Sequence, residues 1–212
     1  RLNQEGKIFN IINCYEWMSF NFGPTLLTWM EDKAPQVYAR LIEGDRKSVQ
    51  RSGYGNALAQ AYHHIIMPLT TDLDRDVEIS WAIADFEHRF GRRPQGMWLP
   101  ETGVDIPTLD ALARAKIEFT ILAPRQAMAV ADLDSEEWIP VDETGLDTSR
   151  PYLVNLPSGQ SIAVFFYNGS LSHGVAFDNY LRDGERFWQK IVSGHSGGLL
   201  NLATDGESYG HH

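Results

Sequence analysis

The spacing of hydrophobic and polar residues predicts alternating helices and strands along this chain. Ile79, Ile83, Phe86 and Phe90 recur at intervals of three or four positions, which marks one face of an amphipathic helix, and Gly91 is typical of the residue that ends it. Apolar runs too short for a helix are typical of buried strands. Such runs lie at residues 8–12, 96–99, 119–122 and 199–203.

The first third of the chain also carries helix-start and turn signals. Proline is favoured in the first turn of a helix, so Pro24 predicts a helix over residues 24–30, and the helical period continues over 34–42. Residues 53–56 predict a turn. The apolar stretch 57–69 fits either a strand or a helix.

The clearest unit is a strand, a helix and a strand between residues 96 and 122. Asp105 predicts the N-cap of the helix and Pro107 its first turn, while Leu109 and Leu112 lie on its inner face. Two strands joined by one helix over so short a distance form a βαβ unit. We therefore expect these two strands to be parallel, with a right-handed crossover.

The pattern changes after residue 126. The acidic segment 127–151 has little period and predicts an insertion on one face of the sheet. Pro157-Ser158-Gly159-Gln160 separates apolar runs at 152–156 and 161–167, which predicts a β-hairpin, and residues 178–192 have a helical period. Together the elements favour one α/β, barrel-like domain with a hairpin excursion.

Composition narrows the class of protein. The 212 residues are 43% hydrophobic and 11% aromatic, enough to bury a sizeable core. A net charge of -10 argues against nucleic acid or an anionic membrane surface as the main partner. Cys14 is the only cysteine, which excludes a disulfide framework and a cysteine-based zinc site. No apolar run reaches membrane-spanning length and no signal peptide is visible, so we expect a cytoplasmic protein.

Two acidic residues follow two of the predicted strands. Glu101 comes after Met97-Trp98-Leu99-Pro100, and Asp205 comes after Leu202-Ala203-Thr204. In α/β barrels, side chains at the carboxyl ends of strands line the active site, and a carboxylate pair there suits glycoside hydrolysis. A carboxylate after a strand is, however, more commonly a helix cap or a turn residue.

The amino-acid sequences of three segments resemble the signature regions of glycoside hydrolase family 57. The segment that runs from Gly91 through Trp98 to Glu101 resembles the third region, in which Trp, an apolar residue and Pro precede the catalytic Glu. The last eight residues, Asp205-Gly206-Glu207-Ser208-Tyr209-Gly210-His211-His212, resemble the fourth region, whose Asp is the general acid/base. His64, four residues before Pro68-Leu69, resembles the second region. The three motifs occur in the family's order.

This resemblance implies a fold, a reaction and a role for each residue. It implies an incomplete (β/α)7 TIM-like barrel and a retaining mechanism on α-glucans, without cofactor or metal. Glu101 would be the nucleophile and Asp205 the general acid/base, which must be protonated before the first step. Burial and the nearby charge of Glu101 would favour that state. The resemblance also implies that four residues contact or orient an oligo- or polysaccharide: His64, Trp98, Glu207 and His211.

The resemblance covers only part of the family's domain. The family's first signature region, a strand end with His-Gln-Pro or a variant of it, has no counterpart here and is expected upstream of Arg1. The chain ends at the fourth region, so the C-terminal helical part that closes the cleft is expected beyond it. Residues 1–212 are therefore interpreted as one partial barrel domain.

Two other interpretations stay open at this point, and a third motif is interpreted as a loop between a helix and a strand. A metal-dependent polysaccharide deacetylase could use His63, His64, Asp205, Glu207 and His211 as ligands, although adjacent histidines on a strand would point to opposite faces. A non-catalytic glycan-binding barrel would use the aromatic residues alone. Gly194-His195-Ser196-Gly197-Gly198 matches the nucleophile-elbow pattern of hydrolases, but a helix precedes it and a strand is expected after it, the reverse of the required order.

Overall fold

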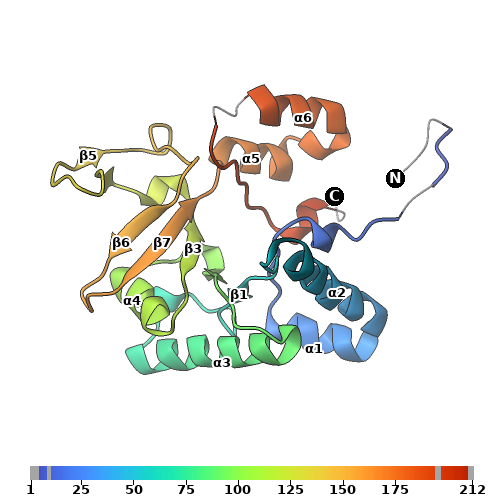
Figure 1. The fold of residues 1–212 in the computed structure, drawn as a ribbon, viewed down its shortest axis with the longest axis horizontal. Helices are drawn as coiled ribbons and strands as arrows, with labels where there is room; N and C mark the ends of the chain where they lie inside the picture. The colour runs from blue at the N-terminus through green and yellow to red at the C-terminus, as the bar shows by residue number, and fades with distance from the viewer. Residues whose placement is uncertain (1–4, 9–10, 194–196, 210–212) are drawn as a thin grey trace. The chain divides into compact units, whose positions relative to one another are not determined.

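The computed structural model describes residues 5–8, 11–193 and 197–209. The chain forms two compact units, each with its own hydrophobic core. Unit 1 comprises residues 1–118 together with 156–160, and unit 2 comprises residues 119–155 and 161–212. Both contain helices and strands, so the expected α/β class is confirmed (Figure 1). In the described part of the chain no helix has the length and apolar character needed to cross a membrane.

The described residues of unit 1 form four α-helices and a two-stranded sheet. The helices are α1 (Pro24–Lys33), α2 (Pro35–Ser52), α3 (Asp72–Phe90) and α4 (Ile106–Arg114). The strands are β1 (Ala59–Gln60) and β2 (Met97–Trp98). Short 3-10 helices lie at η1 (Cys14–Glu16), η2 (Met67–Leu69) and η3 (Pro100–Thr102).

The predicted apolar face of α3 and its end at Gly91 are confirmed, and the structure adds its N-cap. Thr71 caps its N-terminus by accepting a hydrogen bond from the Asp74 backbone N–H, and Gly91 ends it in the left-handed conformation, with φ 65°. Ile79 and Phe86 from the expected face are buried. This face packs α3 against β1, and the helix also contacts α2 and α4 (Figure 1).

The sheet of unit 1 is parallel. Ala59 pairs with Met97 and Gln60 with Trp98, and a parallel bridge between Phe20 and Ala57 extends the pairing by one chain segment. Parallel strands place their carboxyl ends at one edge of a sheet. The segments that follow β1 and β2 therefore start from the same edge.

A buried ion pair ties the start of β1 to α2. Asp45 is 1% exposed, and both of its carboxylate oxygens accept hydrogen bonds from Arg92, at 2.7 and 2.9 Å. The Ala57 backbone N–H also donates to Asp45, at 2.7 Å, and the Ala57 carbonyl accepts from Arg92, at 2.9 Å. One carboxylate thus satisfies a guanidinium and a backbone group of the sheet.

Replacing Asp45 with Ala is expected to destabilise the protein by about 3–5 kcal/mol, because it leaves the Arg92 charge and the Ala57 N–H without their shared acceptor. Urea unfolding measures this loss. The exposed pair of Asp32 and Lys33 supplies the control, and Asp32→Ala is expected to cost under about 1 kcal/mol. If Asp45→Ala lowers the free energy of unfolding no more than Asp32→Ala does, the ion pair does not stabilise the contact between α2 and the start of β1.

In the part of unit 2 that the structure describes, the chain forms five strands and two α-helices. The strands are β3 (Phe119–Leu122), β4 (Ala129–Val130), β5 (Ile139–Pro140), β6 (Tyr152–Asn155) and β7 (Ser161–Phe166). The helices are α5 (Gly169–Phe177) and α6 (Gly184–Ser193), and the 3-10 helices are η4 (Pro124–Gln126), η5 (Tyr180–Arg182) and η6 (Gly206–Tyr209).

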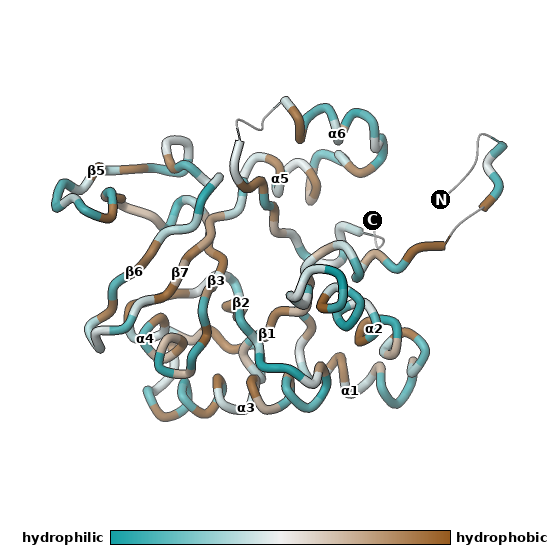
Figure 2. Tube along the Cα trace, in the orientation of Figure 1, coloured by the Kyte–Doolittle hydropathy of each residue, from teal (hydrophilic) through white to brown (hydrophobic). Residues whose placement is uncertain are grey.

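The main sheet of unit 2 combines both kinds of pairing. Its order is β3-β7-β6, with β3 parallel to β7 and β6 antiparallel to β7. The predicted hairpin is confirmed, and its turn contains Gly159 with φ 79°, a conformation in which glycine avoids side-chain strain. The acidic insertion forms a small antiparallel pair, β4 and β5, with a hydrophilic tip (Figure 2).

Three expectations about strands are wrong. Ile8, Ile11 and Ile12 are exposed, so a buried strand is wrong at these positions of the first run, and residues 9–10 lie outside the described part. Residues 199–203 form no strand and are half-buried or exposed. The βαβ unit over 96–122 is not closed by pairing, because β2 pairs with β1 whereas β3 pairs with β7. Apolar runs indicated which segments are hydrophobic, but not their partners.

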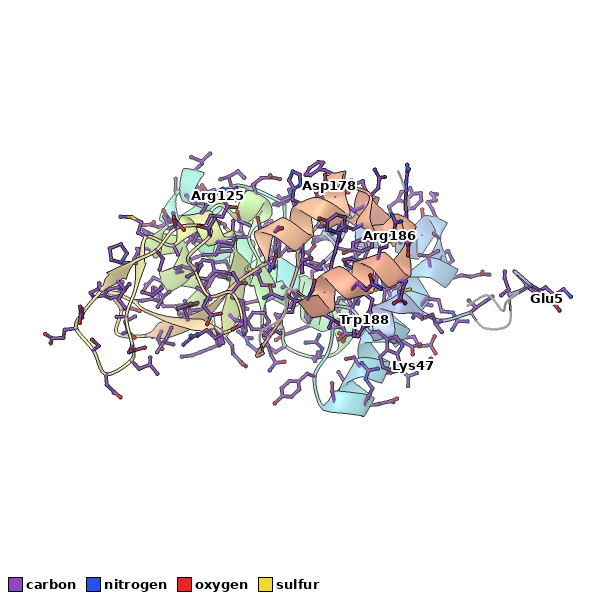
Figure 3. The ribbon with its side chains drawn as sticks, turned by 90° about the horizontal axis from the view of Figure 1, so that it is seen from above. Glu5, Lys47, Arg125, Asp178, Arg186 and Trp188 are labelled. Atoms are coloured by element: carbon purple, nitrogen blue, oxygen red, sulfur yellow. The ribbon has the colours of Figure 1, made fainter. Side chains whose placement is uncertain are left out.

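The helices of unit 2 differ from the expectation in number. The sequence predicted one helix over 178–192, and the structure has η5 and α6 there, preceded by α5, which was not predicted. Asn168 caps α5 by accepting from the Leu171 N–H, at 2.9 Å. Trp188, labelled in Figure 3 with Arg186, is 58% exposed, and α6 contains no buried residue.

Candidate active site

Glu101 lies at the carboxyl end of β2, as expected. It is the middle residue of η3, which begins two residues after the strand ends. Glu101 and Thr102 both adopt left-handed backbone conformations, with φ 55° and 52°. For non-glycine residues this conformation costs about 1–3 kcal/mol each, and it persists where the surroundings enforce it. Here the Thr102 N–H donates to the Leu99 carbonyl at 2.9 Å, and the Gly103 N–H donates to the Pro100 carbonyl at 3.0 Å.

His64 lies on the segment that follows β1, the strand beside β2. It too is left-handed, with φ 55°, and its N–H donates to the Ala61 carbonyl at 3.2 Å. The assumption that His63 and His64 lie on a strand is therefore wrong, because Tyr62 and His63 form a turn. Both His64 and Glu101 are exposed. Outside these segments, left-handed non-glycine residues occur at Lys116 and Asn179 in the described structure.

The segments that carry His64 and Glu101 touch each other. A Cβ atom placed on Gly103 would lie 3.1 Å from Cγ2 of Ile66 and 3.7 Å from Cδ of Pro68. Any larger residue at 103 would have to push against the segment that contains His64. The second and third motifs of the sequence are therefore brought together at one edge of the sheet.

Trp98 is half-buried, whereas its neighbours Met97 and Leu99 are buried, with exposures of 1% and 0%. Successive side chains of a strand point to opposite faces. Trp98 therefore lies on the face opposite to the two buried residues. This placement is compatible with the expected contact to a sugar ring, because part of the indole is accessible.

Asp205 belongs to unit 2, where its segment is attached to the end of β7. The Asn168 N–H donates to the Asn201 carbonyl at 2.8 Å, and the Asn201 side-chain amide donates to the Phe166 carbonyl at 3.2 Å. The Ala203 N–H donates to the Ser172 hydroxyl at 3.1 Å. These bonds hold residues 201–203 at the carboxyl end of β7 without forming a strand, and Asp205 follows two residues later.

The start of the same segment is held by a second loop. The Leu199 N–H donates to the Ser149 carbonyl at 2.8 Å. The Ser149 hydroxyl and backbone N–H and the Arg150 guanidinium donate to Asp147, which lowers the pKa of that carboxyl group to about 2. Asp147 therefore stays ionised at all ordinary pH values and keeps this loop in place.

The remaining predicted residues also lie in unit 2. Glu207 is exposed on η6, and His211 lies outside the described residues. Asp205 is exposed, so the contacts of unit 2 do not supply its expected burial. The structure thus brings His64, Trp98 and Glu101 to one edge of unit 1, and a shared cleft with Asp205 and Glu207 stays a prediction.

Sequence reasoning missed several groups around these residues. Glu78, on α3, contacts His63 through both carboxylate oxygens, and Asn201 links its segment to β7. Asn168 precedes an apolar stretch, a typical cap signal that could have predicted α5. The left-handed residues carried no such signal. Within residues 5–8, 11–193 and 197–209, no three side chains of His, Cys, Asp or Glu are grouped so that they could hold a metal ion.

The positions of the two candidate carboxylates are those expected of an α/β enzyme. Glu101 follows the carboxyl end of the parallel strand β2, and the segment that precedes Asp205 is hydrogen-bonded to the carboxyl end of β7, which is parallel to β3. The carboxyl ends of parallel strands are where α/β enzymes place their active sites. Glu101 is exposed, its loop packs against the segment that follows His64, and Trp98, three residues earlier, is half-buried. A carboxylate in such a place can act as a nucleophile or a base toward a bound substrate.

The chain belongs to glycosyl hydrolase family 57, whose family model matches residues 4–212. It is 23% identical over 193 residues to Alpha-amylase 1 of Dictyoglomus thermophilum, which covers 91% of this chain and 26% of that protein. The chain thus spans about a quarter of the length of that relative.

Two solved structures show the same fold. The 4-alpha-glucanotransferase of Thermococcus litoralis matches 92% of this chain and 28% of its own, with a TM-score of 0.62 and 21% identity. A protein of Mycobacterium smegmatis described as a polysaccharide deacetylase matches 85% of this chain and 62% of its own, with a TM-score of 0.51 and 15% identity.

Proposed function

We propose that the protein is a retaining glycoside hydrolase or transglycosylase that acts on α-glucans. In this proposal Glu101 is the nucleophile that forms a glycosyl–enzyme intermediate, and Asp205 is the general acid/base. Asp205 first protonates the leaving oxygen and then deprotonates water or an acceptor hydroxyl. The incomplete (β/α)7 barrel expected from the sequence is part of this proposal.

The observation that carries the proposal is the position of Glu101 in a chain that belongs to this family. Glu101 follows a parallel strand, is exposed in an enforced left-handed turn, and lies on a loop that touches the His64 segment. A strained, over-determined backbone at a strand end is typical of residues that must be presented accurately. The amylase and glucanotransferase to which the chain is similar support α-glucans as the substrate class.

The other residues have supporting roles in this proposal. The imidazole of His64 hydrogen-bonds a sugar hydroxyl, and the accessible face of Trp98 forms one wall of the sugar subsite. Glu207 and His211 orient Asp205 or contact sugar. No cofactor is required, because the covalent step uses a protein carboxylate.

The configuration of the first product tests the proposal in the intact protein. With a malto-oligosaccharide, early NMR spectra are expected to show the α-anomer, because two inversions occur at one carbon. Activity is expected to be unchanged in EDTA. Initial release of the β-anomer would contradict the retaining mechanism.

Two other results would favour the alternative functions. Acetate release that EDTA abolishes and a divalent ion restores would favour a deacetylase, whose fold resembles this one. Binding of the oligosaccharide without turnover would favour a glycan-binding barrel.

A further inference from the structure

Glu78 is a buried carboxylate that the proposed chemistry does not use. Its side chain is only 9% exposed on α3. Buried carboxylates occur where charged or polar partners satisfy them. Both partners of Glu78 belong to one residue: the His63 backbone N–H donates to Oε2 at 2.9 Å, and the His63 ring Nδ1 lies 2.5 Å from Oε1.

The contact between Nδ1 and Oε1 sets the tautomer of the His63 ring. An ionised carboxylate only accepts hydrogen bonds, so Nδ1 must carry the proton that it donates to Glu78. In the neutral ring, Nε2 then has a free lone pair. The bond to the backbone N–H also fixes the peptide group between Tyr62 and His63, and therefore fixes the turn itself.

This turn is the one that presents His64. On one side it is attached to α3, by Glu78 and by edge contacts of the Tyr62 and His63 rings with Trp81, at 5.5 and 5.9 Å between ring centroids. On the other side, the residues after His64 pack against Gly103 in the loop of Glu101. The turn is thus held between the helix and the proposed nucleophile loop.

We propose that Glu78 is a positioning residue, which holds the His63 backbone and thereby places His64 for contact with the sugar. This inference rests on the proposed function, since it assigns His64 to substrate binding. Glu78 itself acts through the turn and does not touch substrate. The exposed ring of His63 reports whether the contact with Glu78 exists, because its tautomer follows from that contact.

Two substitutions of Glu78 separate its effect on the backbone from its effect on the ring. In Glu78→Gln, the amide oxygen must accept the His63 N–H, so the amide NH₂ faces Nδ1 and donates to it. The turn is kept, but the neutral ring must switch to the Nε2–H tautomer. Glu78→Leu has a similar size and offers neither bond. Glu87→Gln is the matched control, because Glu87 is on the same helix and pairs with Arg93 at the surface.

Kinetics of the intact protein with a malto-oligosaccharide give the first measurement. Glu78→Leu is expected to raise KM about 10-fold with kcat within about 3-fold, because a sugar contact made equally in the ground and transition states affects KM. Glu78→Gln and the control are expected to keep KM within about 3-fold of wild type. If Glu78→Leu does not fold, Glu78→Asp replaces it, since its shorter side chain cannot reach both groups of His63.

Spectra of histidine labelled with ¹⁵N give the second measurement, at a pH where the ring is neutral. They are expected to show Nδ1–H in wild type and Nε2–H in Glu78→Gln. An unchanged tautomer would overturn the inference, as would a wild-type KM in a folded variant that lacks the backbone acceptor.

The failure of the proposed function is distinguishable, because wild type itself would then leave α-glucans intact. In that case the rate of amide hydrogen exchange at His63 and His64 tests whether Glu78 holds the turn. Faster exchange in Glu78→Leu supports positioning of the turn, and unchanged exchange overturns it.

Discussion

Glu101→Gln is expected to reduce turnover of α-glucans by roughly 10⁴-fold or more in the intact protein, because an amide cannot form the glycosyl–enzyme ester. Gln has nearly the same shape and keeps the Cβ atom, so the left-handed turn carries the same strain as in wild type. The fold and the affinity for substrate are therefore expected to persist. Initial rates with a malto-oligosaccharide measure the loss, and thermal unfolding checks the fold.

Glu118→Gln is the control for this experiment. Glu118 is an exposed glutamate that directly precedes β3, at the amino end of a strand, where side chains of α/β enzymes contribute to stability rather than to chemistry. We expect this variant to keep wild-type activity. If Glu101→Gln also keeps it, the assignment of the nucleophile is wrong.

Asp205→Ala is expected to slow hydrolysis of unactivated α-glucans by about 10³-fold or more, because both steps lose their proton-transfer group. Substrates with good leaving groups need no proton in the first step, so the variant should still form the intermediate and accumulate it. Azide attacks this intermediate without base assistance and should accelerate turnover. The glycosyl azide is expected to have the retained α-configuration, and NMR determines it.

The same reagent is expected to behave differently with Glu101→Ala. Azide then occupies the place of the missing carboxylate and attacks the substrate directly, which gives the inverted β-azide. If the two configurations were exchanged between the variants, the roles of Glu101 and Asp205 would be reversed. Asp134→Ala, in the exposed loop between β4 and β5, is the control and should produce no azide adduct.

The elements with local end signals were predictable from the sequence. Thr71 and Gly91 at the ends of α3, and Asp105 before α4, act on residues within one turn of themselves, so neighbouring positions in the chain contain all the necessary information. The hairpin at β6 and β7 belongs to the same kind, because only the five residues 156–160 separate its strands. The motif residues could likewise be recognised, since the order of residue types is a property of the chain.

Pairing between distant segments was decided only by the tertiary structure. The apolar runs at 96–99 and 119–122 were both identified, yet each strand found a different partner from the one expected. Hydrophobicity indicates that a strand is buried but does not select the edge beside which it lies. The run at 199–203 shows the same limit, because its backbone bonds go to the Ser149 loop and to the end of β7 instead of to a strand.

The geometry around Glu101 also depended on contacts that the sequence does not reveal. Left-handed residues at His64 and Glu101 are unfavourable locally and exist only because the surrounding structure enforces them. Glu78 reaches His63 from 15 residues away, and Arg92 reaches Asp45 from 47 residues away. The sequence by itself therefore determined the helices that have local end signals, such as α3 and α4, and indicated the candidate residues of the site. Packing of distant segments decided how those residues are presented, because their backbone conformations and buried charges are stable only with partners far along the chain.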